Sequence, residues 1–313
     1  MKTTTPISVH SRVLGGLLGV HAGDSLGATN EFASWAALAR GPRQTGIVGG
    51  GAFNWRAGDA TDDTDLTAAV LAAYTAPDGF RLEVAADNML AWYRRGPRDV
   101  GGTTAGGLRA YASTGDPRTS GVPKSPANGS LMRCIPTGLF RRGLDDATTQ
   151  QRRTESAEIS AITHADPIAV GCCVFYNEVV AGLCAGLAPT AAIERARPFA
   201  GVYSVAEAVG RGEVLRLDDM VNHGPDGLLG GGRGDARDAL SLALAALLDP
   251  RPFTDTITDI AMLGGDTDTN AAIAGGLVGV RDGSDGIPAA WVEVLQYRDT
   301  FIAAADVAVA AQQ

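Results

Sequence analysis

Apolar side chains recur at three- and four-residue spacing through most of this chain, which is the periodicity of amphipathic helices. Between residues 62 and 76, for example, Leu66, Val70 and Tyr74 fall on one helical face. The same pattern predicts helices over 11–26 (with Ser11 as N-cap), 62–76, 82–94, 152–165, 169–187, 236–248, 268–280 and 289–311. Stretches with strand character are limited to 45–48 and 214–217, which are too short to carry a sheet. Because no linker or repeat interrupts the chain, the pattern predicts one all-α domain covering residues 1–313.

Glycine accounts for 41 of the 313 residues, and its placement changes this picture. Gly15, Gly19, Gly23 and Gly27 recur at every fourth position, so one face of the first predicted helix has no side chains. Each helical glycine costs about 1 kcal/mol relative to alanine, so we expect another helix or a ligand to lie directly against that face. Three glycine-rich stretches are predicted to be loops: 41–58, 101–107 and 224–234.

Composition and charge exclude several classes of protein. Hydrophobic residues make up 45% and charged residues 19% of the chain, which rules out intrinsic disorder. Because 35 acidic residues exceed 26 basic ones, the chain is a poor candidate for a nucleic-acid binder that relies on a basic face. The apolar runs are short and broken by glycine, so we expect neither a membrane span nor a signal peptide. Four cysteines without metal-ligand spacing are expected to be buried reduced thiols, which suits a cytoplasmic protein: Cys134, Cys172, Cys173 and Cys184.

Two short acidic clusters carry the candidate chemistry: Thr-Asp-Asp-Thr-Asp at 61–65 and Gly-Asp-Thr-Asp-Thr at 265–269. Each precedes a predicted helix, so helix capping by Asp and Thr is one interpretation. The clusters hold more carboxylates than capping needs, and such carboxylates repel one another unless cations neutralise them. Oxygen ligands of this kind suit Mg²⁺, Mn²⁺ or Ca²⁺, and two clusters far apart in sequence could converge on a two-metal site.

Residues 63–67 also match the Asp-x-Asp-x-Thr pattern of phosphatases of the haloacid dehalogenase type. That pattern requires a buried strand immediately before the first Asp, whereas residues 54–60 are polar and interrupted by glycine. The chain also lacks the alternation of strands and helices that such a fold needs. An EF-hand is excluded because its fixed Gly and terminal Glu are absent. The phosphatase interpretation is therefore disfavoured.

Five motifs follow one another in order between residues 14 and 280. They are Gly23-Asp24-Ser25-Leu26-Gly27 with Glu31-Phe32, then Thr61-Asp62-Asp63-Thr64, Asn128-Gly129-Ser130-Leu131-Met132-Arg133, Thr163-His164, and residues 264–276, which begin Gly-Gly-Asp-Thr-Asp-Thr-Asn. In this order they resemble the motifs of the ADP-ribosylglycohydrolase family, which includes the dinitrogenase-reductase-activating glycohydrolase and the ADP-ribosylarginine and ADP-ribosylserine hydrolases. Each motif alone is weak, but five in order are strong.

The resemblance implies a single-domain orthogonal helical bundle that binds two divalent cations, Mg²⁺ or Mn²⁺. The implied metal ligands come from the two acidic clusters: Thr61, Asp62, Asp63, Asp266, Asp268 and Thr269. The implied catalytic residues are Glu31, Asp62, Asp63, Asp99 and Asp266. Glu31 would lie at the edge of the metal site. Asp99 is a looser match, for which a surface aspartate in a loop is an equal alternative.

The same resemblance implies that the diphosphate of ADP-ribose binds where backbone N–H groups can approach it closely. The candidate ADP-ribose-binding residues are Gly101, Gly102, Asn128, Gly129, Ser130 and His164. His164 would lie near the distal part of ADP-ribose, with a core or capping role as the alternative. Arg133 could reach a phosphate or form an internal ion pair, and His21 is expected to be structural.

The implied function is metal-dependent hydrolysis that removes ADP-ribose from a modified acceptor by cleavage at the anomeric carbon of the ribose. A catalytically inactive relative that binds ADP-ribose or serves a structural role is the alternative, and the two intact acidic clusters favour the enzyme. The acceptor is left open between arginine, serine and others, as is the choice between Mg²⁺ and Mn²⁺. The expected partner is an ADP-ribosylated protein or another modified acceptor. We expect no membrane, nucleic acid only as a modified substrate, and a monomer.

Overall fold

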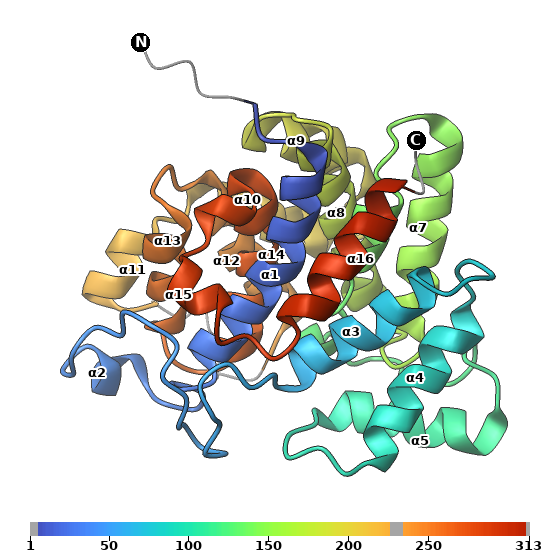
Figure 1. Cartoon of the computed structure of the whole chain (residues 1–313), viewed down its shortest axis with the longest axis horizontal. Coiled ribbons are helices and arrows are strands. Elements are labelled where there is room, and N and C mark those ends of the chain that lie inside the picture. The colour runs from blue at the N-terminus through green and yellow to red at the C-terminus, as the bar shows by residue number, and fades with distance from the viewer. Residues whose placement is uncertain (1–5, 226–233, 311–313) are drawn as a thin grey trace.

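The computed structural model describes residues 6–225 and 234–310, and helices form its regular structure (Figure 1). The α-helices within these residues are α1 Val9–Gly27, α2 Trp35–Leu38, α3 Asp62–Tyr74, α4 Leu82–Arg94, α5 Gly102–Thr114, α6 Ile135–Phe140, α7 Asp146–Ala161, α8 Pro167–Cys184, α9 Pro189–Ala196, α10 Tyr203–Val214, α11 Leu217–His223, α12 Ala236–Leu248, α13 Phe253–Ala261, α14 Thr267–Asp282, α15 Ala289–Val292 and α16 Arg298–Ala310. Three 3-10 helices accompany them: η1 Asn128–Ser130, η2 Arg197–Phe199 and η3 Ser284–Gly286. Outside the helices the described residues form only isolated β-bridges, so the predicted all-α fold is confirmed.

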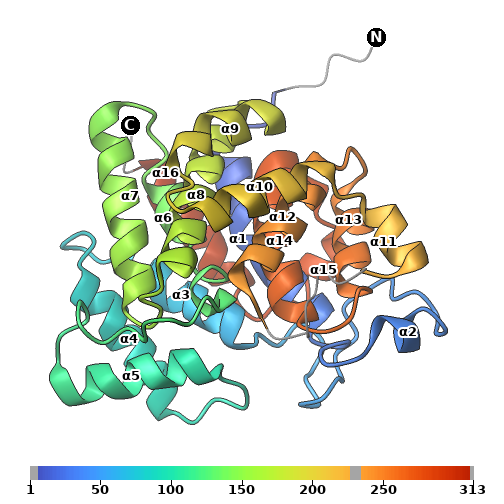
Figure 2. The ribbon, with the colours of Figure 1, turned by 180° about the vertical axis from the view of Figure 1, so that it is seen from behind.

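Helices α1 and α14 lie against each other at the centre of the molecule, as seen from both sides (Figures 1 and 2). The glycine stripe of α1 is the contact surface. A Cβ atom added to each of its glycines would collide with the backbone carbonyl oxygen of the facing residue: Gly15 with Gly279, Gly19 with Gly275, Gly23 with Ala271 and Gly27 with Thr267. The predicted close approach to the stripe is therefore confirmed, and its partner is a helix. Because the helices are antiparallel, the end of α1 lies beside the start of α14, where Thr267 Oγ1 donates to the Gly27 carbonyl (2.7 Å).

Helix α8 is a core helix that packs on α6, α7 and α9. In the described part of the chain it is the one helix long and apolar enough, by length and composition, to cross a membrane. However, 72% of that stretch is buried inside the protein, which is typical of a core helix. Cys172, Cys173 and Cys184 lie on this helix, and together with Cys134 they are buried free thiols, as predicted.

Besides the helix predicted over 152–165, which is α7 and begins six residues earlier, at Asp146, after its N-cap Asp145, three predicted boundaries were wrong. Helix α1 begins earlier, because the side chain of Ser8, and not of Ser11, is the N-cap and accepts from the backbone N–H of Ser11 (3.1 Å). Residues 101–107 are not a loop: Gly101 is the N-cap of α5, and the glycines let this helix pack closely. A Cβ at Gly107, for example, would collide with the backbone of Thr163.

The third error lies in residues 289–311, which form α15 and α16 instead of one helix. The connection between them is held by Gln296, whose backbone N–H donates to the Gly58 carbonyl (3.0 Å) and whose side chain accepts from the Ala60 N–H (3.1 Å). This tertiary contact, and not a local helix breaker, interrupts the helical pattern.

The remaining predictions concern short elements and loops. Helices α2, α6, α9, α10, α11 and α13 were not predicted, because helices of a few turns depend on tertiary packing more than on local propensity. Residues 45–48 and 214–217 form no strand, and 41–58 is a loop with glycines at positive φ, as expected. Most of the predicted 224–234 loop, residues 226–233, lies outside the described residues.

Candidate active site

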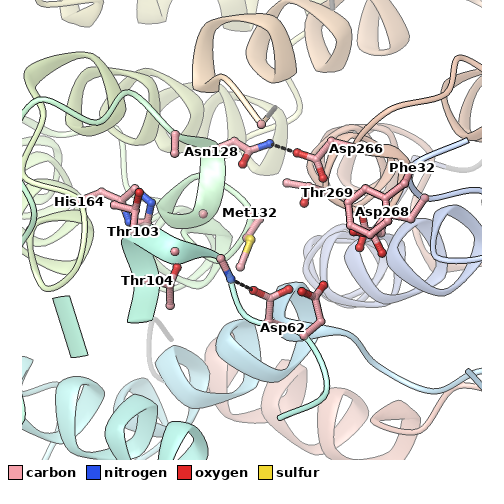
Figure 3. A pocket seen from close by; sticks show the side chains of 17 residues that line it. Phe32, Asp62, Thr103, Thr104, Asn128, Met132, His164, Asp266, Asp268 and Thr269 are labelled. Carbon is pink, nitrogen blue, oxygen red and sulfur yellow. Dashed lines mark hydrogen bonds between the residues drawn. The ribbon is translucent and has the colours of Figure 1, made fainter. Parts of the chain in front are cut away.

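The two acidic clusters meet in one pocket of 330 Å³ (Figure 3). Its walls come from the segments after α1 and α7, the starts of α3, α5 and α14, the region of η1 and the segment before α12. The lining residues are Glu31, Phe32, Asp62, Asp99, Gly101, Gly102, Thr103, Thr104, Ala127, Asn128, Gly129, Met132, His164, Gly234, Asp266, Asp268 and Thr269. Three predicted site residues, Thr61, Asp63 and Ser130, are not among them and lie buried behind the wall.

The first acidic cluster lies at the start of α3, and the N-terminus of this helix is capped by residues other than Asp62. Thr61 is the N-cap and accepts from the backbone N–H of Asp63 (3.3 Å). The buried carboxylate of Asp24, on α1, accepts from the backbone N–H groups of Thr61 (3.1 Å) and Thr64 (3.2 Å). Asp24 therefore ties the start of α3 to α1. Its part in the site was not predicted, although it belongs to the first motif.

Asp63 links the two acidic clusters from behind the pocket. Its Oδ2 accepts from the hydroxyls of Thr61 (3.0 Å) and Thr269 (3.4 Å), so both threonines contact this carboxylate. Its Oδ1 is buried without a partner. This arrangement joins the first turn of α3 to the first turn of α14.

The second cluster opens α14, and here the capping interpretation fails. Asp266 is the N-cap residue, yet its side chain makes no capping hydrogen bond. Its Oδ2 accepts instead from the side-chain amide of Asn128 (2.7 Å; Figure 3). Asp268 is 1% exposed, and its Oδ1 has no partner.

The carboxylates in this region crowd one another. Oxygens of Glu31, Asp99 and Asp268 lie within 4.8 Å of one another, and Asp99 is half-buried in the pocket wall instead of lying at an open surface. Burial, followed by the charge of Asp99, raises the pKa of Glu31 to about 8 and that of Asp62 to about 8. Burial and neighbouring carboxylates also raise the pKa of Asp268 well above its usual value.

This donor set suits a divalent cation. Of the five buried carboxylate oxygens without a hydrogen-bond partner in the described part of the chain, one (Asp259 Oδ2) forms an ion pair with Arg251, and the other four belong to the two clusters and their neighbours: Asp24 Oδ1, Glu31 Oε2, Asp63 Oδ1 and Asp268 Oδ1. Unpaired buried carboxylates are costly unless a cation neutralises them. Because Mg²⁺ and Mn²⁺ prefer such oxygen ligands, the residues fit the metal centre that the motifs implied.

The opposite side of the pocket is built from the start of α5. The backbone N–H groups of Gly102, Thr103 and Thr104 belong to the first helical turn, which leaves them without intrahelical acceptors. These N–H groups and the positive end of the helix dipole present hydrogen-bond donors and positive potential to the pocket, which suits an anion. Two backbone N–H groups that were expected to donate to the diphosphate already have acceptors in the protein. The N–H of Gly101 donates to Asp62 (3.4 Å), and the N–H of Asn128 donates to the Gly234 carbonyl (2.8 Å).

His164 lies at the same side, held from behind by a buried arginine. Its Nδ1 is 2.7 Å from Thr163 Oγ1, which accepts from Arg133 Nη2 (2.7 Å). Arg133 is fully buried and also donates to the Gly129 carbonyl, so it supports the pocket wall and does not reach a phosphate. Burial, and then the charge of Arg133, lowers the pKa of His164 to about 3 and keeps it neutral.

Two other predictions about side chains can be decided. The buried Ser130 Oγ accepts from the Ser160 hydroxyl (2.9 Å), so this side chain serves the core and not the pocket. His21 is structural, as predicted: it is fully buried, lies 3.2 Å from the Gly58 carbonyl, and burial lowers its pKa to about 3.

Comparison with known proteins decides the family. A family model described as ADP-ribosylglycohydrolase matches residues 5–313. The chain belongs to the ADP-ribosylglycohydrolase family. This ADP-ribosylglycohydrolase is 31% identical to ADP-ribosylarginine hydrolase Tri1 of Pseudomonas putida (strain GB-1), over 93% of the chain and 76% of that protein. It is 28% identical to the ADP-ribosyl-[dinitrogen reductase] glycohydrolase of Rhodospirillum rubrum, over 93% of the chain and 92% of that protein.

The fold agrees with this assignment. A solved structure of an ADP-ribosylglycohydrolase-related protein complex matches with a TM-score of 0.78 at 28% identity, covering 98% of the chain and 99% of that structure. The ADP-ribosylglycohydrolase is therefore an all-α enzyme that hydrolyses a glycosidic bond and releases ADP-ribose from an acceptor. The resemblance drawn from five sequence motifs is confirmed.

Several pocket residues of the ADP-ribosylglycohydrolase were missed by the sequence analysis. Thr103 and Thr104 follow the glycine pair that was assigned to a loop, and assigning a helix there would have revealed them. Phe32 directly follows Glu31 and shares its motif, but a lone aromatic residue carries no signal of exposure. Gly234 ends the predicted 224–234 loop, but no local pattern links it to the pocket, since only the fold brings it to Asn128.

Proposed function

We propose that the enzyme is a metal-dependent ADP-ribosylarginine hydrolase. The observation that carries this proposal is the set of unpartnered buried oxygens on Glu31, Asp63 and Asp268. Glu31 and Asp268 line the pocket, and Asp63 lies behind its wall, where it accepts from the hydroxyl of the pocket residue Thr269. No capping or ion-pair role accounts for them. A cation site does, because divalent cations neutralise such a set.

The proposed ligands for two Mg²⁺ or Mn²⁺ ions are Thr61, Asp62, Asp63, Asp266, Asp268 and Thr269, with Glu31 and Asp99 beside them. Bound cations would hold the ribose hydroxyls and lower the pKa of a bound water. Asn128 would position Asp266 through its amide hydrogen bond of 2.7 Å. Asp24 would hold the start of α3 in place through the backbone of Thr61 and Thr64.

The chain's own groups bind the rest of ADP-ribose in this proposal. The free amides of Gly102, Thr103 and Thr104 would receive the diphosphate at the start of α5. Neutral His164 would contact the distal part of the ligand, with its ring orientation set by Thr163 and Arg133. The Gly129 position leaves room for this, because a Cβ there would lie 3.0 Å from the His164 ring.

Glu31 is the proposed proton carrier. Hydrolysis forms a bond between water oxygen and the anomeric carbon and breaks the bond from that carbon to the arginine nitrogen. One water proton stays on the new hydroxyl, and the other passes through Glu31 Oε2 to the released guanidine nitrogen. Glu31 suits this role because it lines the pocket and its Oε2 is buried without a hydrogen-bond partner, so this oxygen is free to take up and release a proton.

Arginine is the proposed acceptor for two reasons. The relative from Pseudomonas putida is an ADP-ribosylarginine hydrolase at 31% identity. Among the described residues, the pocket lining contains five carboxylates and neither Lys nor Arg, which favours a cationic leaving group. We also propose that the chain works as one domain in a reducing compartment such as the cytoplasm, which its four buried free thiols support.

The test is release of ADP-ribose from an ADP-ribosylarginine peptide and an ADP-ribosylserine peptide, each with Mg²⁺, with Mn²⁺ and after chelation. We expect arginine turnover that chelation abolishes and metal restores, together with calorimetric binding of free ADP-ribose. Turnover that survives chelation would overturn the metal dependence. Binding of ADP-ribose without turnover of either peptide would support the inactive relative instead.

A further inference from the structure

Phe32 is an aromatic side chain that the fold exposes at the mouth of the pocket. It is 63% exposed and has φ of 65°, a conformation that is strained for a bulky residue. The backbone around it is fixed: its N–H donates to the Gly265 carbonyl (2.8 Å), and the Gly265 N–H donates to the Ala33 carbonyl (2.8 Å). The loop before α14 therefore holds Phe32 next to the carboxylates, although its ring gains little from burial.

Phe32 is the inner end of a row of rings that we call the aromatic ledge: Phe32, Phe53 and Trp55. The centroids of Phe32 and Phe53 are 6.1 Å apart, and those of Phe53 and Trp55 are 5.9 Å apart. The outer end of the ledge already binds a guanidinium, because Arg98 lies over the Trp55 ring at 5.0 Å. The chain itself thus contains an example of the stacking that a guanidinium makes with these rings.

The position of Phe32 in the pocket points to the acceptor. In Figure 3 Phe32 lies on the side of the pocket opposite His164, the side on which Asp268 and Thr269 are also drawn. If ADP-ribose extends from the start of α5 and His164 to the carboxylates, its anomeric carbon ends near Phe32. The group bonded to that carbon is the acceptor, so the exposed ring borders the space that the acceptor occupies.

We propose that Phe32 determines acceptor specificity by stacking its ring on the guanidinium of ADP-ribosylarginine. This inference rests on the proposed function and adds a contact to it. A planar, weakly hydrated guanidinium stacks well on an aromatic face, whereas the serine side chain offers no cation. The carboxylates of Glu31 and Asp99, which line the same pocket as Phe32, favour the same cation. The strained backbone of Phe32 is therefore retained because it aims the ring at the leaving group.

Substitution at Phe32 tests the proposal with kcat/KM on an ADP-ribosylarginine peptide as the readout. Phe32→Leu keeps an apolar side chain but removes the π face, so kcat/KM should fall about tenfold. Phe32→Tyr keeps the face and should stay within about twofold of the parent. The inhibition constant of free arginine should rise with Phe32→Leu by a similar factor, while the affinity for free ADP-ribose stays unchanged.

Two further variants keep the result interpretable. Phe32→Gly removes the ring and tolerates φ of 65°, so it should fold at least as stably as the parent and lose the same activity. Phe80→Leu is the matched control, because Phe80 stacks on Tyr74 (4.4 Å) away from the pocket and should not change arginine inhibition.

The outcomes separate this inference from the proposed function. A parent enzyme without turnover of the arginine peptide in the presence of metal overturns both. An active parent whose Phe32→Leu and Phe32→Gly variants keep kcat/KM overturns only the role of Phe32. Weaker ADP-ribose binding in these variants would overturn it too, because the ring would then contact the nucleotide and not the acceptor.

Discussion

Helices α3 and α14 both begin in an acidic cluster, but their carboxylates differ in the hydrogen-bond donors that the surrounding residues offer them. At α3 the N-terminal amides are satisfied by Thr61 and Asp24. The extra carboxylate of this cluster, Asp65, accepts from Trp92 Nε1 (2.7 Å) and from the Tyr297 hydroxyl (2.7 Å). At α14, by contrast, Asp266 has one side-chain donor and Asp268 keeps a buried oxygen without any.

This difference distinguishes carboxylates that stabilise the fold through hydrogen bonds from carboxylates that are free to bind a ligand. Asp65 has a donor on each oxygen, so it fixes the first turn of α3 against α4 and the residue before α16. Asp63 and Asp268 keep unpartnered oxygens and lie where the two helix starts meet. A buried carboxylate oxygen without a donor lowers stability, so these two oxygens point to a ligand that neutralises them.

The largest expected effect is that of Asp268→Asn. As a metal ligand Asp268 should be needed for cation binding, so turnover should fall by about 100-fold or more. The metal-free melting temperature should stay unchanged or rise, because one charge leaves a crowded cluster. Activity assays and thermal melts with and without Mn²⁺ measure both. Parental turnover with Asn at this position would contradict the metal assignment.

The second prediction concerns pH and the metal-free enzyme. Burial and neighbouring charge raise the pKa of Glu31 and of Asp62 to about 8, above the unfolded values near 4. The folded state then binds more protons than the unfolded state between these values, so the free energy of unfolding should decrease as pH rises from 4 to 8. Saturating Mn²⁺ should flatten this slope. Denaturant unfolding of the metal-free enzyme across this pH range measures the slope. A free energy of unfolding that increases with pH would contradict the proposed repulsion between the pocket carboxylates.

A third prediction tests how the two helix starts are brought together. Gly23→Ala would drive a methyl group into the Ala271 carbonyl on α14, so the free energy of unfolding should drop by about 3 kcal/mol or more. Gly210→Ala is the matched control: it lies on α10 with open space around it and should stabilise by about 0.5–1 kcal/mol. Equal effects of the two changes would mean that the glycine stripe does not set the α1–α14 distance.

The smallest effect is expected for Asp65→Asn. An amide cannot accept from both Trp92 and Tyr297 as a carboxylate does, so the free energy of unfolding should fall by about 1–2 kcal/mol. Turnover of the folded variant should stay within about fivefold of the parent, because the substitution leaves the proposed metal ligands Asp63 and Asp268 in place. Urea unfolding and steady-state kinetics separate the two. A loss of turnover as large as that of Asp268→Asn would erase the distinction between the clusters' structural and ligand carboxylates.

Much of the site was available from sequence because its signals are local. The acidic clusters, the Asn-Gly-Ser run and His164 stand in short motifs, and all but Thr61, Asp63 and Ser130 of the predicted residues line the pocket. The secondary structure of residues 101–107 was misassigned because glycines there indicate a loop unless packing makes a helix favourable.

The sequence by itself determined a helical chain, two acidic helix starts, and a first helix whose glycine face needs a close neighbour. It did so because helical periodicity and glycine's lack of a side chain act within a few residues. Only the tertiary structure decided that α14 is that neighbour and that Asp65 is satisfied while Asp268 is not. The donors to Asp65 lie 27 and 232 residues away in sequence, so no local pattern encodes which carboxylates remain free to bind a cation.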